Sequence, residues 1–130
     1  MTIQILGTPY TVKKVPYEAD PAFKERSIDG YCDELLKRVV ICDMSTFPGM
    51  KNESKEFVAA FEKSILRHEI VHSFLNESGL SSSAVGTDCW SKNEEMIDWF
   101  AIQGEKIVAV WNQCETDFAR MNADEVASNA

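Results

Sequence analysis

The sequence contains little that would support a role at membranes or on nucleic acid. No apolar run approaches the roughly 20 residues of a membrane-spanning helix, and the first residues, Met1–Gln4, do not begin a secretory signal. The 13 lysines and arginines are outnumbered by 21 acidic residues and form no cluster, whereas phosphate contacts require clustered basic side chains. We therefore expect a cytoplasmic protein that binds neither membranes nor nucleic acid.

Cysteine is scarce and dispersed. The four cysteines lie far apart without a C-x-x-C pair, so we expect no cysteine-based zinc site and mostly buried, reduced thiols. The chain of 130 residues, 45% of them hydrophobic, is long enough for one domain with its own core. We assign this domain to residues 1–120 and treat residues 121–130 as a polar C-terminal tail.

Histidine is rarer still, yet its two copies lie together. His68 and His72 flank Glu69 in the pattern H-E-x-x-H, within a segment from Phe57 to Ser78 that has helical periodicity. Residues four apart share one face of a helix, so the two imidazoles can bind one zinc ion, with Glu69 as general base for a metal-activated water. Two unrelated histidines on a surface helix are the alternative, but both extend an apolar stripe, where imidazoles without a partner are costly.

A catalytic zinc site normally has three protein ligands, and the chain has no third histidine. A carboxylate is therefore required, and the segment Asn93–Ala101 reads as a helix with Glu94 and Asp98 on one face. We expect Glu94 to be the third ligand and Asp98 to accept a hydrogen bond from a ligating imidazole. Glu95 points about 100° away from Glu94 and is the less suitable ligand.

Two other roles are open for Glu94. Ser91-Lys92-Asn93-Glu94 fits the S-x-x-E capping box, in which the glutamate bonds back to the start of the helix. Glu94 and Glu95 could also both be ordinary surface residues. We favour the ligand role because the two histidines otherwise lack a partner.

The motif and the acidic segment together resemble a known group of enzymes. His68–His72 followed by Asn93–Gln103 is similar to the small zinc metallopeptidases encoded by phages and prophages, and the resemblance covers most of the chain, from Gly30 to Gln103. The likeness to the ImmA/IrrE-type bacterial metalloproteases is looser. Both groups have the gluzincin pattern of two histidines and a glutamate.

The resemblance implies that His68, His72 and Glu94 bind zinc, that Glu69 is the catalytic base, and that the protein acts in the cytosol of a bacterial host. One departure from the pattern is that neither histidine nor tyrosine follows Glu94 to stabilise an oxyanion.

The remaining pattern predicts an α+β fold. We expect a small antiparallel sheet of two hairpins packed beside the H-E-x-x-H helix and a second, glutamate-bearing helix. That second helix is expected to begin near Ser91 and to weaken or break at Gly104, with a further helix over Glu105 to Cys114. The three tryptophans are expected mainly in packing roles.

These expectations lead to two functional hypotheses. The first is a zinc-dependent peptidase whose peptide or protein substrate adds to a free edge strand beside the metal. The strand Arg38 to Asp43 is one candidate for that edge strand. It could equally be an ordinary strand in the core. The second is a zinc-binding phage accessory or partner-binding module without proteolytic activity. The presence of Glu69 favours the first, because a structural zinc site has no need of a base.

Overall fold

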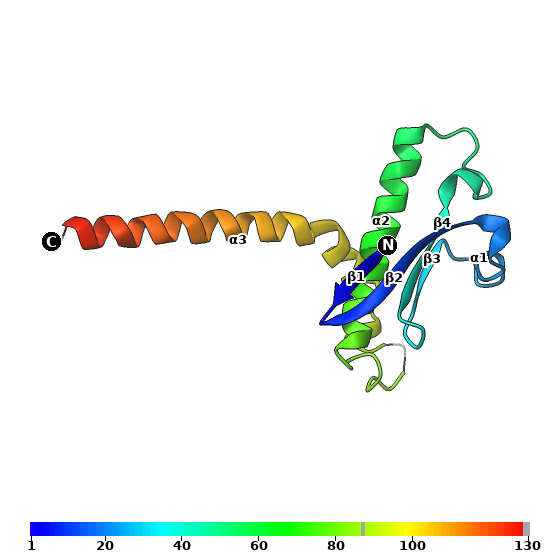
Figure 1. Ribbon diagram of the computed structural model, residues 1–130, viewed down its shortest axis with the longest axis horizontal. Coiled ribbons are helices and arrows are strands. Elements are labelled where there is room, and N and C mark those ends of the chain that lie inside the picture. Colours follow the sequence, from blue (N-terminus) through cyan, green and yellow to red (C-terminus); the bar gives the residue numbers. More distant parts are fainter. Residues whose placement is uncertain (87, 129–130) are drawn as a thin grey trace.

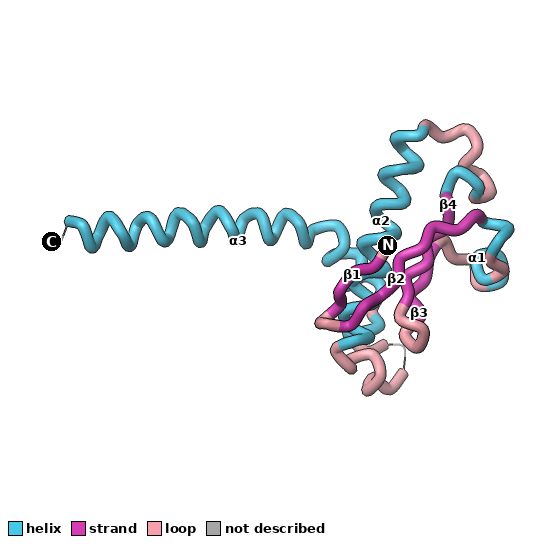
Figure 2. The backbone as a smooth tube through the Cα atoms, in the orientation of Figure 1, coloured by secondary structure: helices cyan, strands magenta, loops and turns pink. Residues whose placement is uncertain are grey.

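The computed structural model describes residues 1–86 and 88–128, and in this part of the chain the fold is α+β, as predicted. Four strands form one sheet, a long helix lies against the sheet, and a second long helix projects away from both (Figures 1 and 2). The elements are β1 (Thr2–Ile5), β2 (Thr8–Pro16), η1 (Tyr17–Ala19), α1 (Ala22–Glu25), β3 (Gly30–Asp33), β4 (Arg38–Asp43), η2 (Met44–Thr46), α2 (Lys55–Glu77), η3 (Trp90–Lys92) and α3 (Glu94–Ser128).

The sheet is mixed, where an antiparallel sheet was expected. Its order is β1-β2-β4-β3. The hairpins β1–β2 and β3–β4 are antiparallel as predicted, but β2 and β4 join them in parallel, from Thr11 opposite Arg38 to Pro16 opposite Asp43. Because the connection through η1 and α1 carries the chain past the position of β4, β4 is an interior strand, and β1 and β3 are the two edge strands. Arg38 to Asp43 is therefore not the edge strand.

The core lies between β4 and α2. The middle of β4 is a continuous apolar run, and all four of its central residues are buried, as expected for a strand covered on both faces. Ile65 of α2, Phe23 of α1 and Met44 of η2 complete the buried cluster. The helix that carries the H-E-x-x-H motif is thus packed against the sheet.

The second long helix is continuous where the sequence suggested a break. The helix α3 runs from Glu94 to Ser128 through Gly104, so the predicted boundary between two helices is wrong. Most of residues 121–130, expected to be a polar tail, continue α3; residues 129–130 of that tail lie outside the described residues. Among the described residues, no helix is long and apolar enough to cross a membrane.

Candidate metal centre

Three residues of the candidate site come from the middle of α2. The helix begins after Ser54, whose hydroxyl accepts a hydrogen bond from the Phe57 backbone N–H at 3.1 Å and thereby satisfies one of the free donors of the first turn. Three turns later His68 and His72 face the same side, with side chains 22% and 21% exposed. The helix therefore presents both imidazoles to a half-buried seam, as the spacing predicts.

The fourth residue comes from the first turn of α3. The Asn93 side chain accepts a hydrogen bond from the Met96 backbone N–H at 2.8 Å, so Asn93 caps this helix and Glu94 is its first residue. Ser91 lies in η3, and its hydroxyl donates to the Leu80 carbonyl at 3.2 Å. The S-x-x-E capping box is therefore not formed, and the Glu94 carboxylate is free to point at α2.

The donor atoms of His68, His72 and Glu94 converge. The two Nε2 atoms lie 3.1 Å apart, and Glu94 places Oε2 3.0 Å from His68 Nε2 and Oε1 3.4 Å from His72 Nε2. Ligands bound tetrahedrally at about 2.1 Å from a zinc ion lie roughly 3.4 Å from one another. The spacing fits a zinc site with three protein ligands. Glu95 is exposed and belongs to no such group among the described residues.

Asp98 lies one turn beyond Glu94 and contacts His68 from the other side of the ring. Its Oδ1 atom is 2.6 Å from His68 Nδ1. A carboxylate at this position can accept a hydrogen bond from Nδ1–H, and that tautomer has its lone pair on Nε2, on the side of His72 and Glu94. The position predicted for Asp98, as the partner of a ligating imidazole, is the one that it occupies.

Glu69 is set apart from these ligand atoms by burial. It is only 7% exposed, and its Oε1 lies 4.0 Å from His68 Nε2. Burial raises its pKa to about 7, with His68 acting in the opposite direction; a bound cation would lower that pKa again. A carboxylate that takes and releases a proton near neutral pH is suited to general-base chemistry.

The state of His72 suits metal binding. Burial holds the pKa of His72 below its ordinary value, against the opposing effect of the Glu94 carboxylate. A lowered pKa favours the neutral ring, which is the form that donates an electron pair to a metal.

A groove of about 950 Å³ opens over these side chains. The walls come from three elements: Gly30, Tyr31 and Cys32 of β3; His68, Glu69 and His72 of α2; and Glu94 and Asp98 of α3. The edge strand β3 thus borders the site, although no sequence pattern assigned its residues to the site. The glycine at the start of this short strand was the available signal. The sequence could not show that β3 is an edge strand, because that depends on which strands pair with β4.

Gly30 explains how β3 comes so close to α2. It is buried at the start of the strand, and a β-carbon there would contact the side chains of Ile65 and Glu69 and the Val40 carbonyl. Only a residue without a side chain allows this approach. Gly30 therefore fixes the width of the groove at Glu69.

Comparison of the chain with protein-family models, with curated proteins and with solved structures finds no match. The assignment of a function therefore depends on the site itself.

Proposed function

We propose that the protein is a zinc-dependent metallopeptidase in which His68, His72 and Glu94 hold the metal and Glu69 is the general base. One observation carries the proposal: three donor atoms at tetrahedral spacing lie beside a buried carboxylate that is not one of them. A site that only stabilised the fold would not use that carboxylate, whereas peptide hydrolysis requires a base. From the resemblance of the motifs we further propose a phage or prophage peptidase acting in the bacterial cytosol.

The reaction divides between the metal and the side chains. A zinc ion at this site supplies Lewis-acid polarisation of the scissile carbonyl and lowers the pKa of water. Glu69 accepts a proton from the attacking water and returns it to the leaving amine, which balances the hydrolysis. Asp98 is a positioning residue, because its contact with Nδ1 fixes the orientation and tautomer of His68.

The edge strand supplies a place for the substrate backbone. β3 pairs with β4 on one side and with no other strand of the described chain, and three of its residues line the groove. An extended peptide can add to the free side through main-chain hydrogen bonds. Such a peptide would run past Gly30, where a β-carbon would lie 3.5 Å from Cγ of Glu69.

The experiment is zinc analysis and peptide hydrolysis by the wild type and by Glu69→Gln, with Glu95→Gln as the matched control. We expect about one zinc per chain in all three proteins, and cleavage of a fluorogenic peptide library by the wild type and the control only. An amide cannot accept the proton from water. Hydrolysis that survives in Glu69→Gln would contradict the general-base role. Stoichiometric zinc without hydrolysis in any of the three would favour the non-proteolytic binding module.

A further inference from the structure

A stripe of apolar side chains runs along the projecting part of α3. Successive members are three or four residues apart, as in the a and d positions of a coiled coil, and they therefore lie along one side of the helix. We call this stripe the α3 seam: Ile107, Trp111, Cys114, Phe118 and Met121.

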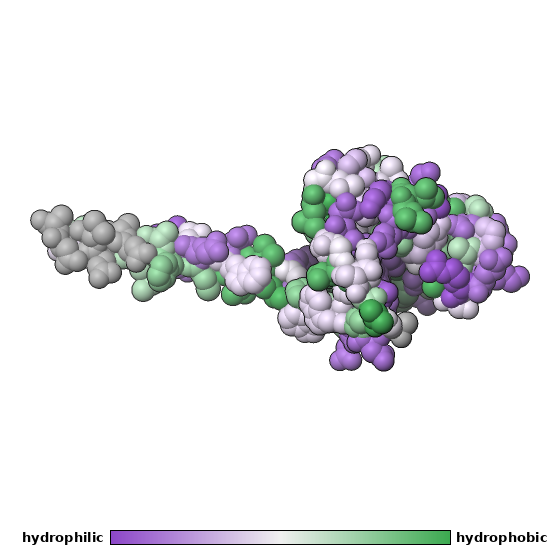
Figure 3. Space-filling model, turned by 90° about the horizontal axis from the view of Figure 1, so that it is seen from below, coloured by the Kyte–Doolittle hydropathy of each residue, from purple (hydrophilic) through white to green (hydrophobic). Residues whose placement is uncertain are grey.

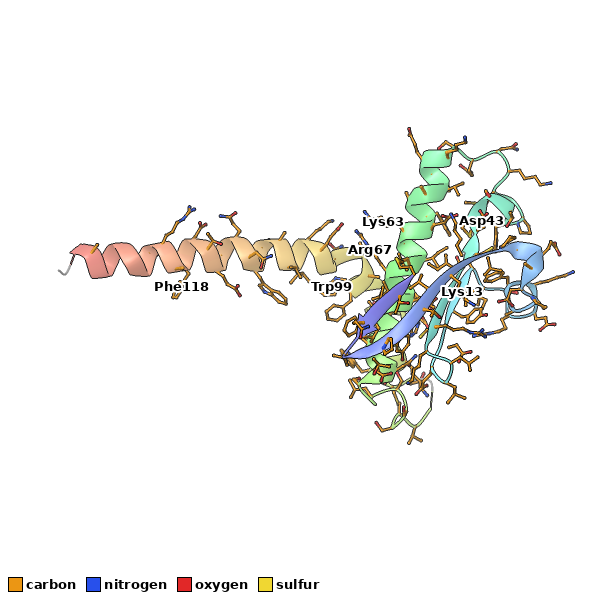
Figure 4. All side chains as sticks on the ribbon, viewed as in Figure 1. Lys13, Asp43, Lys63, Arg67, Trp99 and Phe118 are labelled. Atoms are coloured by element: carbon orange, nitrogen blue, oxygen red, sulfur yellow. The ribbon has the colours of Figure 1, made fainter. Side chains whose placement is uncertain are left out.

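The α3 seam is open to solvent. Every residue from Val108 to Met121 is exposed, and Trp111, Phe118 and Met121 keep 61%, 63% and 67% of their surface. Figure 3 shows apolar atoms along this part of the molecule, and in Figure 4 Phe118 stands well clear of α2 and the sheet. Trp111, expected in a packing role, is therefore mostly exposed and is not part of the buried core.

The opposite side of α3 is different in character. It carries small and polar residues: Ala109, Asn112, Gln113, Thr116 and Arg120. Gln113 donates to Asp117, one turn further on, at 3.1 Å. A helix that is polar on one side and apolar on the other is stabilised by burial of the apolar side against another element, and most helical stability in proteins comes from such packing.

The exposed area is sufficient for a pair of such helices. A large aromatic or methionine side chain that is about 60% exposed leaves roughly 100–150 Å² for a partner to cover. Two copies of the α3 seam, with the flanking valines 108 and 110, would bury on the order of 1,200 Å² in total, within the range of specific interfaces. The 3–4 spacing is the same on both copies, so the surface is complementary to itself, as a two-fold contact requires.

We infer that the α3 seam is a self-association surface and that its occupant is the α3 seam of a second copy of this chain, paired helix to helix. The inference does not depend on zinc or on peptidase activity, because the seam begins beyond Glu94 and Asp98. The pairing places the apolar side chains of both copies between the helices and leaves both polar sides in water.

The test is sedimentation velocity of the full chain across the micromolar range, with zinc content and far-UV circular dichroism measured in parallel. The seam variant is Trp111→Glu with Phe118→Glu. The matched control is Ala109→Glu with Thr116→Glu, which adds the same charges at the same spacing on the opposite side of α3. We expect a dimer for the wild type and the control, and a monomer for the seam variant. Trp111→Ala with Phe118→Ala, which adds no charge, should weaken the dimer at least tenfold.

Three outcomes would overturn the inference: a monomeric wild type with full helix content, a seam variant that dimerises as tightly as the wild type, or an equal loss of dimer in the control. A monomeric wild type would show that the α3 seam does not bind a second copy of this chain. The partner of the α3 seam would then be a helix of a different protein. Zinc content that is unchanged in the seam variant separates the loss of pairing from loss of the fold, and it would leave the peptidase proposal untouched.

Discussion

A β-carbon on Gly30 would lie 2.6 Å from Cγ2 of Ile65. The strand β3 and the helix α2 therefore meet with no space for even a methyl group between them. We predict that Gly30→Ala lowers the free energy of unfolding by about 1–3 kcal/mol, the usual cost of overpacking, as measured by urea unfolding.

The matched control is a glycine with open surroundings. Gly104 lies inside α3, and a β-carbon there meets nothing within 4 Å. Gly104→Ala should raise the stability by about 0.5–1 kcal/mol, because alanine favours the helix. A Gly30→Ala protein as stable as the wild type would contradict the close approach of β3 to α2.

The role of Glu94 as the third zinc ligand can be tested by comparison with Glu95, the next residue in the sequence. Glu94→Ala and His72→Ala each remove one of three donors, and we predict that both lose most of the bound zinc. Glu95→Ala should keep it, because Glu95 is exposed and belongs to no candidate metal-binding group. Isothermal titration with zinc measures the affinities. If Glu94→Ala binds zinc like the wild type, the third ligand lies elsewhere.

The partner of His68 should have an intermediate effect. Asp98 is not one of the three candidate ligands, but its Oδ1 lies 2.6 Å from Nδ1 of His68. Asp98→Ala is predicted to weaken zinc binding by about 10- to 100-fold, and Asp98→Asn to restore part of the loss, because an amide oxygen can accept the same hydrogen bond. Equal affinities for both variants and the wild type would exclude the positioning role.

The stability of the fold should depend on pH through Glu77, a carboxylate outside the candidate metal centre. The Glu77 carboxylate accepts three hydrogen bonds, from Lys37 at 2.8 Å, Thr8 at 2.6 Å and Tyr10 at 2.7 Å. These hydrogen bonds lower the pKa of Glu77 from 4.5 to about 2, and the one from Lys37 has the largest effect. A carboxylate whose pKa is lower in the folded than in the unfolded state stabilises the fold at pH values above its unfolded-state pKa. This stabilisation is lost as the pH falls toward the folded-state pKa.

We therefore predict that Glu77→Gln melts below the wild type at pH 6 and that the difference shrinks between pH 4.5 and about 2. Glu25→Gln, at an exposed position, is the control and should show no such trend. Thermal unfolding by circular dichroism over this pH range measures it. A difference that stays constant down to pH 2 would show that the Glu77 carboxylate is not the group that titrates.

The parts of the site that depend on helical periodicity could be predicted from the sequence. His68 and His72, and likewise Glu94 and Asp98, are four residues apart, and such spacing places side chains on one face wherever the helix packs. In the structure the histidine face of α2 and the acidic face of α3 lie in direct contact. The prediction that they bind zinc awaits the titrations described above.

Other parts depended on contacts that no local pattern records. The parallel pairing of β2 with β4, and hence the edge position of β3, is decided by residues far apart in the chain. Ser91 matched a capping box, but its hydroxyl donates to Leu80 across a loop, and Asn93 caps α3 instead. Gly104 suggested a break, yet one glycine costs a helix only about 1 kcal/mol, and α3 continues past it.

The free side of β3 also carries a hazard. Unpaired backbone N–H and C=O groups that could accept a peptide substrate could equally accept a strand from another molecule and begin aggregation. Three features oppose this: β3 is only four residues long, the acidic Glu34 follows the strand directly, and the net charge of −8 disfavours contacts between copies outside the α3 seam. Asp33, the last residue of the strand, is paired with Arg38 at 3.3 Å. Short length and acidity thus allow an open edge strand to persist in a crowded solution of identical molecules.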